Sequence, residues 1–164
     1  MTKSLSLGTA NFGKKYNFFT NLKIKNKEIK NIFLFLEKNK IFELDTALNY
    51  HNEKQLRLLR SKKWNITTKI DIKNYAKDQN NWKKGKNYLT ELKKKLKIKS
   101  LYATLIHISN LNDFKSKNLK KLFKSLLVLK KNKVIKKIGF SIYDPVEAEL
   151  ILKNFKIDII QLPV

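Results

Sequence analysis

The sequence predicts an α/β protein in which six parallel β-strands alternate with helices. Five apolar stretches each end on a polar residue that could take part in chemistry, and enough chain for a helix separates them. The stretches are 41–45, 64–69, 101–107, 137–141 and 157–161, which end on Asp45, Lys69, His107, Ser141 and Gln161. No Gly-x-Gly-x-x-Gly motif follows any stretch. This weakens the prediction of an open dinucleotide-binding sheet and favours a TIM-type barrel. The C-terminal strand ends of such a barrel form one face, so the five polar residues would converge there.

Local patterns predict the first half of the chain element by element. Residues 4–8 alternate and end in glycine, which predicts a short first strand before the strand at 41–45. Between them, apolar residues at helical spacing predict a helix over 25–38. A short helix over 53–60 leads to the strand at 64–69. Apolar residues on one helical face then predict a helix over 85–97 before the strand at 101–107.

The second half continues the alternation. A long helix is predicted over 113–131, with five residues facing inward: Leu119, Leu122, Phe123, Leu126 and Leu127. Asp144-Pro-Val-Glu147 is typical of a helix start, with Asp144 as the cap and Glu147 closing a capping box. A sixth strand over 157–161 follows, so we expect a single domain over 1–164 with about six β/α units.

The composition is that of a folded protein. Hydrophobic residues make up 42% of the 164 residues, enough for one domain with a core. The chain has no cysteine and two histidines, so thiolate sites are excluded and no metal is expected. The longest apolar run, at 32–36, is far shorter than the ~20 residues of a membrane helix. With no secretory signal visible, we expect a cytoplasmic protein with no membrane partner.

The net charge of +24 is the strongest compositional outlier. One interpretation is nucleic-acid binding through phosphate neutralisation. However, 35 of the 37 basic residues are lysine, and they are scattered over every segment. Lysine is enriched together with asparagine and isoleucine, as AT-rich coding would produce. We therefore expect no specific nucleic-acid partner.

The predicted strand ends carry short motifs in a definite order. They are Leu7-Gly-Thr-Ala-Asn-Phe-Gly13, Asp45-Thr-Ala-Leu-Asn-Tyr50, Thr67-Thr-Lys69, Leu105-Ile-His107, Val134-Ile-Lys-Lys-Ile-Gly-Phe-Ser141 and Ile159-Ile-Gln161. In this order and at these spacings, they resemble the motifs of the aldo-keto reductase family over essentially the whole chain. The resemblance implies a (β/α)8 barrel and an oxidoreductase that reduces a small-molecule carbonyl to an alcohol with hydride from NADPH.

The resemblance also implies a catalytic set. Tyr50 would be the general acid that protonates the carbonyl oxygen as hydride arrives. A free phenol has a pKa of about 10, and a nearby Lys69 would favour the phenolate. Asp45 would pair with Lys69 and keep its ammonium charged, and His107 would orient the substrate oxygen.

For the NADPH cofactor, the resemblance implies a second set of contacts. Ser141 and Gln161 match positions that hold the nicotinamide carboxamide. Gly8 and Thr9 match backbone contacts near the nicotinamide end. The family often has Ser-Asn after its fifth strand, whereas this chain has Ser141-Ile142-Tyr143, which resembles some bacterial members.

Two further features depart from the family pattern. Tyr50-His51-Asn52-Glu53 lacks the glycine and one residue of the usual Tyr-Gly-x-x-Glu, and a shorter turn without glycine would shift Tyr50. Six β/α units, where the family has eight, also lead us to expect a C-terminally truncated, split or partial protein. Two alternatives to a reductase therefore stay open: a non-catalytic barrel remnant that needs a partner chain, and a lysine-rich nucleic-acid-binding protein.

Overall fold

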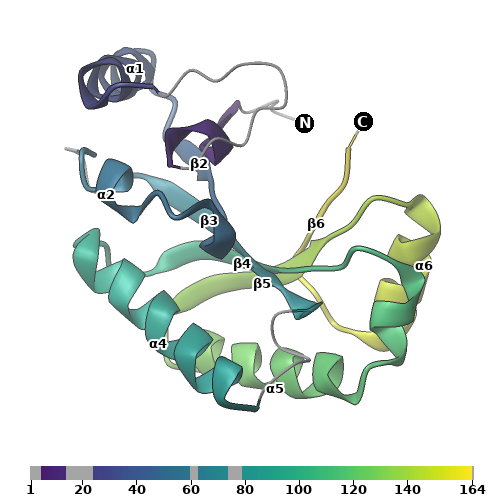
Figure 1. The fold of residues 1–164 in the computed structure, drawn as a ribbon. Coiled ribbons are helices and arrows are strands. Elements are labelled where there is room, and N and C mark those ends of the chain that lie inside the picture. The colour runs from purple at the N-terminus through teal and green to yellow at the C-terminus, as the bar shows by residue number, and fades with distance from the viewer. Residues whose placement is uncertain (1–4, 14–23, 60–62, 74–78, 164) are drawn as a thin grey trace.

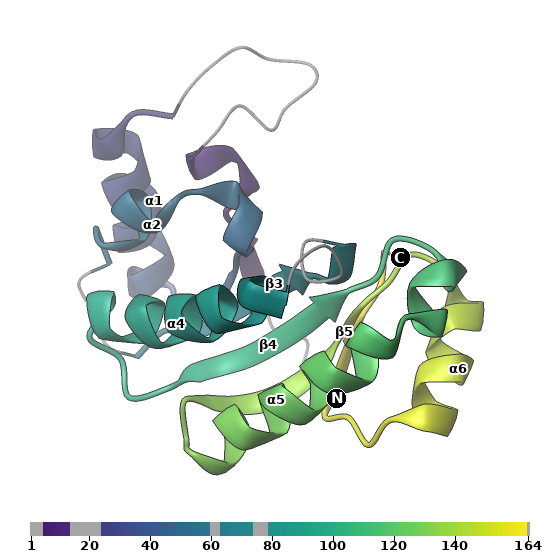
Figure 2. The same ribbon diagram turned by 60° about the horizontal axis from the view of Figure 1, so that its bottom comes forward.

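The computed structural model describes residues 5–13, 24–59, 63–73 and 79–163 and contains one six-stranded sheet. All strand pairs are parallel, and the strands follow one another in sequence order. The strands are β1 (Ser6–Gly8), β2 (Glu43–Asp45), β3 (Asn65–Asp71), β4 (Leu101–His107), β5 (Ile135–Ser141) and β6 (Ile159–Gln161). The sheet curls, with helices along its outer side (Figures 1 and 2). The predicted incomplete (β/α)8 barrel is confirmed.

Helices connect successive strands, as the alternation predicts. The α-helices are α1 (Asn26–Lys38), α2 (Glu53–Leu56), α4 (Gln79–Lys95), α5 (Lys117–Lys131) and α6 (Pro145–Asn154). Short 3-10 helices are η1 (Ala10–Phe12), η2 (Leu48–Tyr50) and η3 (Leu111–Lys115). The predicted start of α6 is confirmed, because the Asp144 side chain accepts a hydrogen bond from the Val146 amide and Glu147 completes the capping box.

The core lies between the sheet and the helices. Ile66 and Ile70 of β3, Ile106 of β4 and Phe140 of β5 are buried and belong to one apolar cluster. The helices supply the other side of the same cluster: Ile29, Phe33, Leu89, Leu92, Leu119, Leu122, Phe123, Leu126 and Leu129. Because alternate strand residues point to this core, the intervening residues of each strand face the inside of the half-barrel.

The structure corrects several predicted boundaries. Strand β3 continues two residues past Lys69, because Ile70 is buried in the core and the ladder to β4 runs on to Asp71.

Helix α2 is shorter than predicted, and α5 begins at Lys117, where Ser116 accepts a hydrogen bond from the Asn118 amide. Leu127 is 44% exposed rather than inward, and Leu129 is buried instead, since Leu127 lies on the flank of the apolar face.

Two features of the structure position strand β6 against β5 and α5. A Cβ on Gly139 of β5 would lie 1.8 Å from the Ile159 carbonyl oxygen, so the absence of a side chain lets the two strands approach. Just before β6, Asp158 accepts hydrogen bonds from the Ile138 amide at 2.8 Å and from the Lys130 ammonium at 2.6 Å. Partial burial opposes ionisation of Asp158, but these hydrogen bonds and the charges of Lys130 and Lys137 outweigh it and lower its pKa.

Three helices end in the same type of turn. The residue after the C-cap of α1, α4 and α5 has a left-handed backbone, and each is a lysine: Lys40, Lys97 and Lys133. After α5, the Lys133 amide donates to the Lys130 carbonyl and the Val134 amide donates to the Leu129 carbonyl. This is a Schellman motif, in which glycine is the usual residue because a Cβ is strained there.

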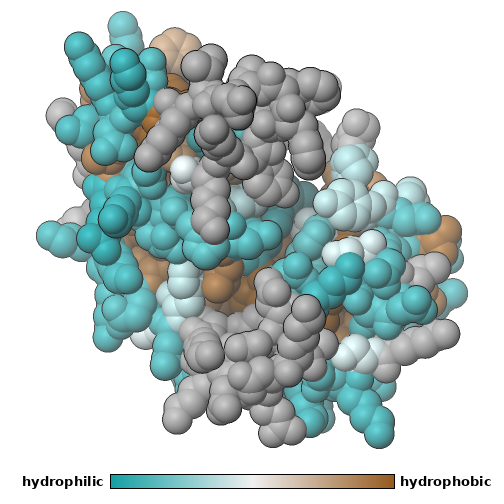
Figure 3. Space-filling model, in the orientation of Figure 1, coloured by the Kyte–Doolittle hydropathy of each residue, from teal (hydrophilic) through white to brown (hydrophobic). Residues whose placement is uncertain are grey.

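The surface of the described residues is mostly hydrophilic on the face drawn in Figure 3. Among the helices that the structure describes, none has the length and apolar character needed to cross a membrane.

Replacing Lys133 by glycine should stabilise the protein. Relief of the left-handed strain is expected to raise the free energy of unfolding by about 1 kcal/mol, which corresponds to roughly 2–4 °C in Tm. Thermal unfolding followed by circular dichroism measures this. The control, Lys131→Gly, lies within α5 and should lower stability by up to about 1 kcal/mol. A Lys133→Gly protein that is less stable than wild type would contradict the expectation.

Asp158→Asn should destabilise the protein in a pH-dependent way. The folded pKa of Asp158 lies below its unfolded value, so its stabilisation is present above about pH 4 and is lost as pH falls through the folded pKa. Because 31% of the side chain is exposed and solvent screens its charge, we expect a loss of only about 1 kcal/mol at pH 7. Urea unfolding across the acidic range should show the difference from wild type shrinking, and a constant difference would argue against this role.

Candidate active site

A row of polar side chains lines the carboxyl edge of the sheet. The last register positions of β3, β4, β5 and β6 are neighbours, and they place Asp71 beside His107, His107 beside Ser141 and Ser141 beside Gln161. Lys69 lies two residues before Asp71, on the same face of β3. Residues from four separate strands are thus brought together, as expected at the C-terminal face of a barrel.

The Lys69 ammonium forms an ion pair with Asp45 at the end of β2. Its Nζ donates to both carboxylate oxygens, at 2.7 Å and 2.5 Å. The Lys69 side chain is 12% exposed and that of Asp45 is 21% exposed, so water reaches neither freely. Pairing compensates the two opposite charges for the loss of hydration.

Gln161 of β6 adds a third contact to this carboxylate. Its Nε2 donates to Asp45 Oδ2 at 3.4 Å, although three strands separate β2 from β6 in the sheet. Such a contact requires the sheet to curl back on itself. The curl therefore brings the carboxyl ends of the second and sixth strands together.

A buried polar network holds the loops on either side of Asp45. Thr9 Oγ1 donates to the Asp45 carbonyl at 2.9 Å, and Asn52 Nδ2 donates to both Thr9 Oγ1 and the Thr9 carbonyl at 2.9 Å. Thr46 Oγ1 in turn donates to Asn52 Oδ1 at 3.1 Å. The Thr9 amide also donates to the Asp45 carbonyl. Asn52 was not among the predicted site residues, and no local motif distinguishes it from other asparagines.

The short turn after β2 brings Tyr50 to the pocket. Tyr50 closes the 3-10 helix η2, and His51 then adopts a left-handed backbone at φ 51° in place of a glycine. A Cβ on Gly13 would lie 2.3 Å from the Tyr50 carbonyl oxygen, so this turn packs directly on the loop after β1. A residue with a Cβ is strained in this left-handed conformation, which glycine adopts without strain.

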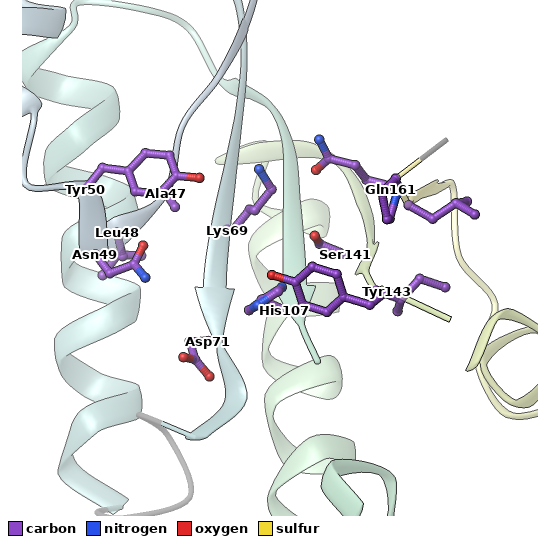
Figure 4. A pocket seen from close by; sticks show the side chains of 13 residues that line it. Ala47, Leu48, Asn49, Tyr50, Lys69, Asp71, His107, Ser141, Tyr143 and Gln161 are labelled. Atoms are coloured by element: carbon purple, nitrogen blue, oxygen red, sulfur yellow. The ribbon is translucent and has the colours of Figure 1, made fainter. Parts of the chain in front are cut away.

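These elements enclose a pocket of about 290 Å³ at the open end of the half-barrel. It is lined by five of the residues predicted for the site: Tyr50, Lys69, His107, Ser141 and Gln161. The Tyr50 hydroxyl points toward the side of the pocket where Lys69 lies (Figure 4). Asp45 lies behind Lys69 and contacts the pocket through it, whereas Gly8 and Thr9 are not among the lining residues.

Two buried polar atoms in this lining have no hydrogen-bond partner: His107 Nδ1 and Gln161 Oε1. Buried polar groups are normally satisfied, so these atoms are available to a molecule in the pocket. The ring of Tyr143 packs edge-on against His107, with centroids 5.5 Å apart. The described residues contain no group of three or more acidic or histidine side chains that could hold a metal.

Three polar or aromatic lining residues were not among the predicted site residues: Asn49, Asp71 and Tyr143. A signal for Asp71 exists, since it lies two residues after Lys69 and period-two alternation puts both on one face. The predicted strand ended at Lys69, which left Asp71 outside it. Asn49 lies in the single turn of η2 and Tyr143 in the loop between β5 and α6, and neither segment is long enough for periodicity to predict the direction of a side chain.

Solved structures share this architecture. A protein from Pseudomonas aeruginosa described as an aldo-keto reductase matches 96% of this chain at 19% identity, with a TM-score of 0.73. The holo form of an aldo-keto reductase from Bacillus halodurans matches 98% at 16% identity, with a TM-score of 0.71. A Bombyx mori aldo-keto reductase in complex with NADP matches 98% at 19% identity, with a TM-score of 0.67. The chain has the aldo-keto reductase fold.

The likeness to aldo-keto reductases is partial in length. The chain spans 61%, 53% and 54% of these three proteins, respectively. No family model matches the sequence, and no curated protein matches it either. The aldo-keto reductase fold thus rests on the three-dimensional arrangement of strands and helices.

The Asp45–Lys69 pair should show strong energetic coupling. Asp45→Asn and Lys69→Met are each expected to lower the free energy of unfolding by about 3 kcal/mol, because each leaves one poorly hydrated charge unpaired. The double variant removes both charges and should lose at least about 1 kcal/mol less than the sum. Urea unfolding of the four proteins measures the coupling.

The exposed pair Glu91–Lys94 on α4 is the matched control. Its Glu91→Gln and Lys94→Met cycle should give a coupling below about 0.5 kcal/mol, since solvent screens it. Additive losses at Asp45 and Lys69 would contradict the inference that pairing offsets their dehydration.

Proposed function

We propose that this protein reduces a carbonyl group to an alcohol with NADPH, using Tyr50, Lys69, Asp45 and His107. The observation that carries the proposal is the pocket at the carboxyl edge of the sheet. A phenol and an imidazole line this pocket, together with an ammonium paired to a carboxylate. The shared fold with aldo-keto reductases, one of them in complex with NADP, supports the same chemistry.

The lining residues fit the carboxamide of a nicotinamide ring. Gln161 Oε1 is a buried acceptor without a partner, suited to a carboxamide N–H, and its Nε2 already donates to Asp45. The Ser141 hydroxyl, on the neighbouring strand, can donate to or accept from the same group. When bound, the cofactor supplies hydride to the substrate carbonyl carbon. Gly8 and Thr9 remain proposed as backbone contacts near the nicotinamide end.

Side chains of the protein supply the proton and stabilise the negative charge that develops during the reaction. As the carbonyl oxygen gains negative charge, the Tyr50 hydroxyl donates its proton to that oxygen. The Lys69 ammonium stabilises the negative charge left on the phenol oxygen, and Asp45 keeps the ammonium charged and in position. His107 orients the substrate oxygen by a hydrogen bond. Water then returns a proton to Tyr50.

Tyr50→Phe should abolish carbonyl reduction and leave cofactor binding nearly intact. Loss of the general acid is expected to lower kcat by at least about 100-fold, measured as NADPH absorbance lost with an aromatic aldehyde as substrate. Binding of NADPH, followed by nicotinamide fluorescence, should change little. Unchanged turnover would remove Tyr50 from the mechanism.

Tyr102→Phe is a matched control, because Tyr102 bonds Lys137 at 2.8 Å and lies outside the pocket lining. It removes one phenol hydroxyl from β4, away from the pocket, and should retain turnover. A wild-type protein with a folded circular dichroism spectrum but no NADPH binding would instead favour a non-catalytic barrel.

A further inference from the structure

Asp71 is a pocket residue that the proposed mechanism does not use. It ends β3 beside His107 of β4 and lines the pocket (Figure 4). Its Oδ1 accepts a hydrogen bond from the Lys73 amide at 2.9 Å. Although the chain has 37 basic and 13 acidic residues, Asp71 takes part in none of the ion pairs found among the described residues.

Among the described lining residues, the charge available to a ligand is therefore negative. Among the described lining residues, Lys69 is the one ammonium, and Asp45 already neutralises it. Asp71 is the one carboxylate in that lining. The pocket thus differs in sign from the protein as a whole, whose charge of +24 attracts anions from a distance.

The position of Asp71 also relates it to the reacting group. His107, which would hold the carbonyl oxygen, is its direct neighbour across the β3–β4 ladder. A substrate held at His107 would therefore have Asp71 on one neighbouring strand and Ser141 on the other. The other nearby lining groups, Asn49 and Tyr143, are polar or aromatic and bring no positive charge that could offset the carboxylate.

We propose that Asp71 determines specificity by selecting carbonyl compounds that carry a hydrogen-bond donor, hydroxyl or ammonium, two or three atoms from the carbonyl carbon. A donor gains a charge-assisted hydrogen bond with the carboxylate. A substrate carboxylate at the same place meets a like charge with little water between, so it is rejected. The inference rests on the proposed reductase function.

A matched set of three-carbon aldehydes tests this selection. Propanal, 3-hydroxypropanal, 3-aminopropanal and 3-oxopropanoate share one length and differ in the terminal group. For each protein, kcat/KM is divided by its own value for propanal, so that general changes in turnover cancel. In wild type, the ratio should exceed about 10 for a donor-bearing aldehyde and fall below about 0.1 for 3-oxopropanoate.

Asp71→Asn is the informative variant, because the amide oxygen still accepts the Lys73 N–H and the strand end is preserved. Its ratio for 3-aminopropanal should fall at least about tenfold, and its ratio for 3-oxopropanoate should rise by a similar factor. Glu91→Gln changes the net charge equally on exposed α4, outside the pocket, and should leave every ratio as in wild type.

The outcomes distinguish the two donor groups, hydroxyl and ammonium. A raised wild-type ratio for the ammonium alone, or for both donors, supports the proposal and names the preferred group. Ratios that are equal in wild type and Asp71→Asn, or that shift as much in Glu91→Gln, overturn it.

Failure of the reductase function gives a different signature, since propanal and the other three aldehydes would then all remain unreduced. Ligand-observed NMR with 3-amino-1-propanol and 3-hydroxypropanoate then decides the role of Asp71 without cofactor. Tighter binding of the amine that is lost in Asp71→Asn supports the inference, and equal binding by both proteins overturns it.

Discussion

The carboxylate of Asp45 is the point on which the candidate site depends. It accepts two hydrogen bonds from Lys69 of β3 and one from Gln161 of β6, and its own carbonyl receives the Thr9 hydroxyl. Little water reaches it, so its charge is stable only while these donors remain in place. Strands β2, β3 and β6 and the loop after β1 thus meet at one residue, which the curl of the sheet makes possible.

A second constraint comes from the short turn after β2. The turn brings Tyr50 to the pocket without the glycine that a left-handed position favours, and His51 adopts that conformation instead. Asn52 then anchors the turn, since its amide bonds Thr9 and accepts from Thr46 in a buried network. The network holds together two loops that are far apart in sequence, and its buried hydrogen bonds are shielded from water. This supports a fixed position for the Tyr50 phenol.

The strands of this protein were largely predictable, and their far ends less so. Strand β4 has the predicted bounds, because an apolar run buried on both faces ends abruptly at the polar His107. Strand β3 runs past Lys69, since a polar residue facing the inside of a half-barrel does not interrupt a ladder whose other face is buried. The same reason explains why Asp71 was overlooked. Leu127 was misplaced because helical periodicity fixes a face only to within one residue at its flank.

By itself, the sequence determined the alternation of strands and helices, the parallel order and the polar residues at the strand ends. These follow from local periodicity and short-range turn chemistry, which depend on neighbours in the chain. Only the tertiary structure decided that Gln161 reaches Asp45 across the sheet and that Thr9 and Asn52 share one buried network. It also decided that Asp71 lines the pocket and forms no ion pair with another described residue. These are contacts between residues distant in sequence, set by the curl of the sheet and by desolvation.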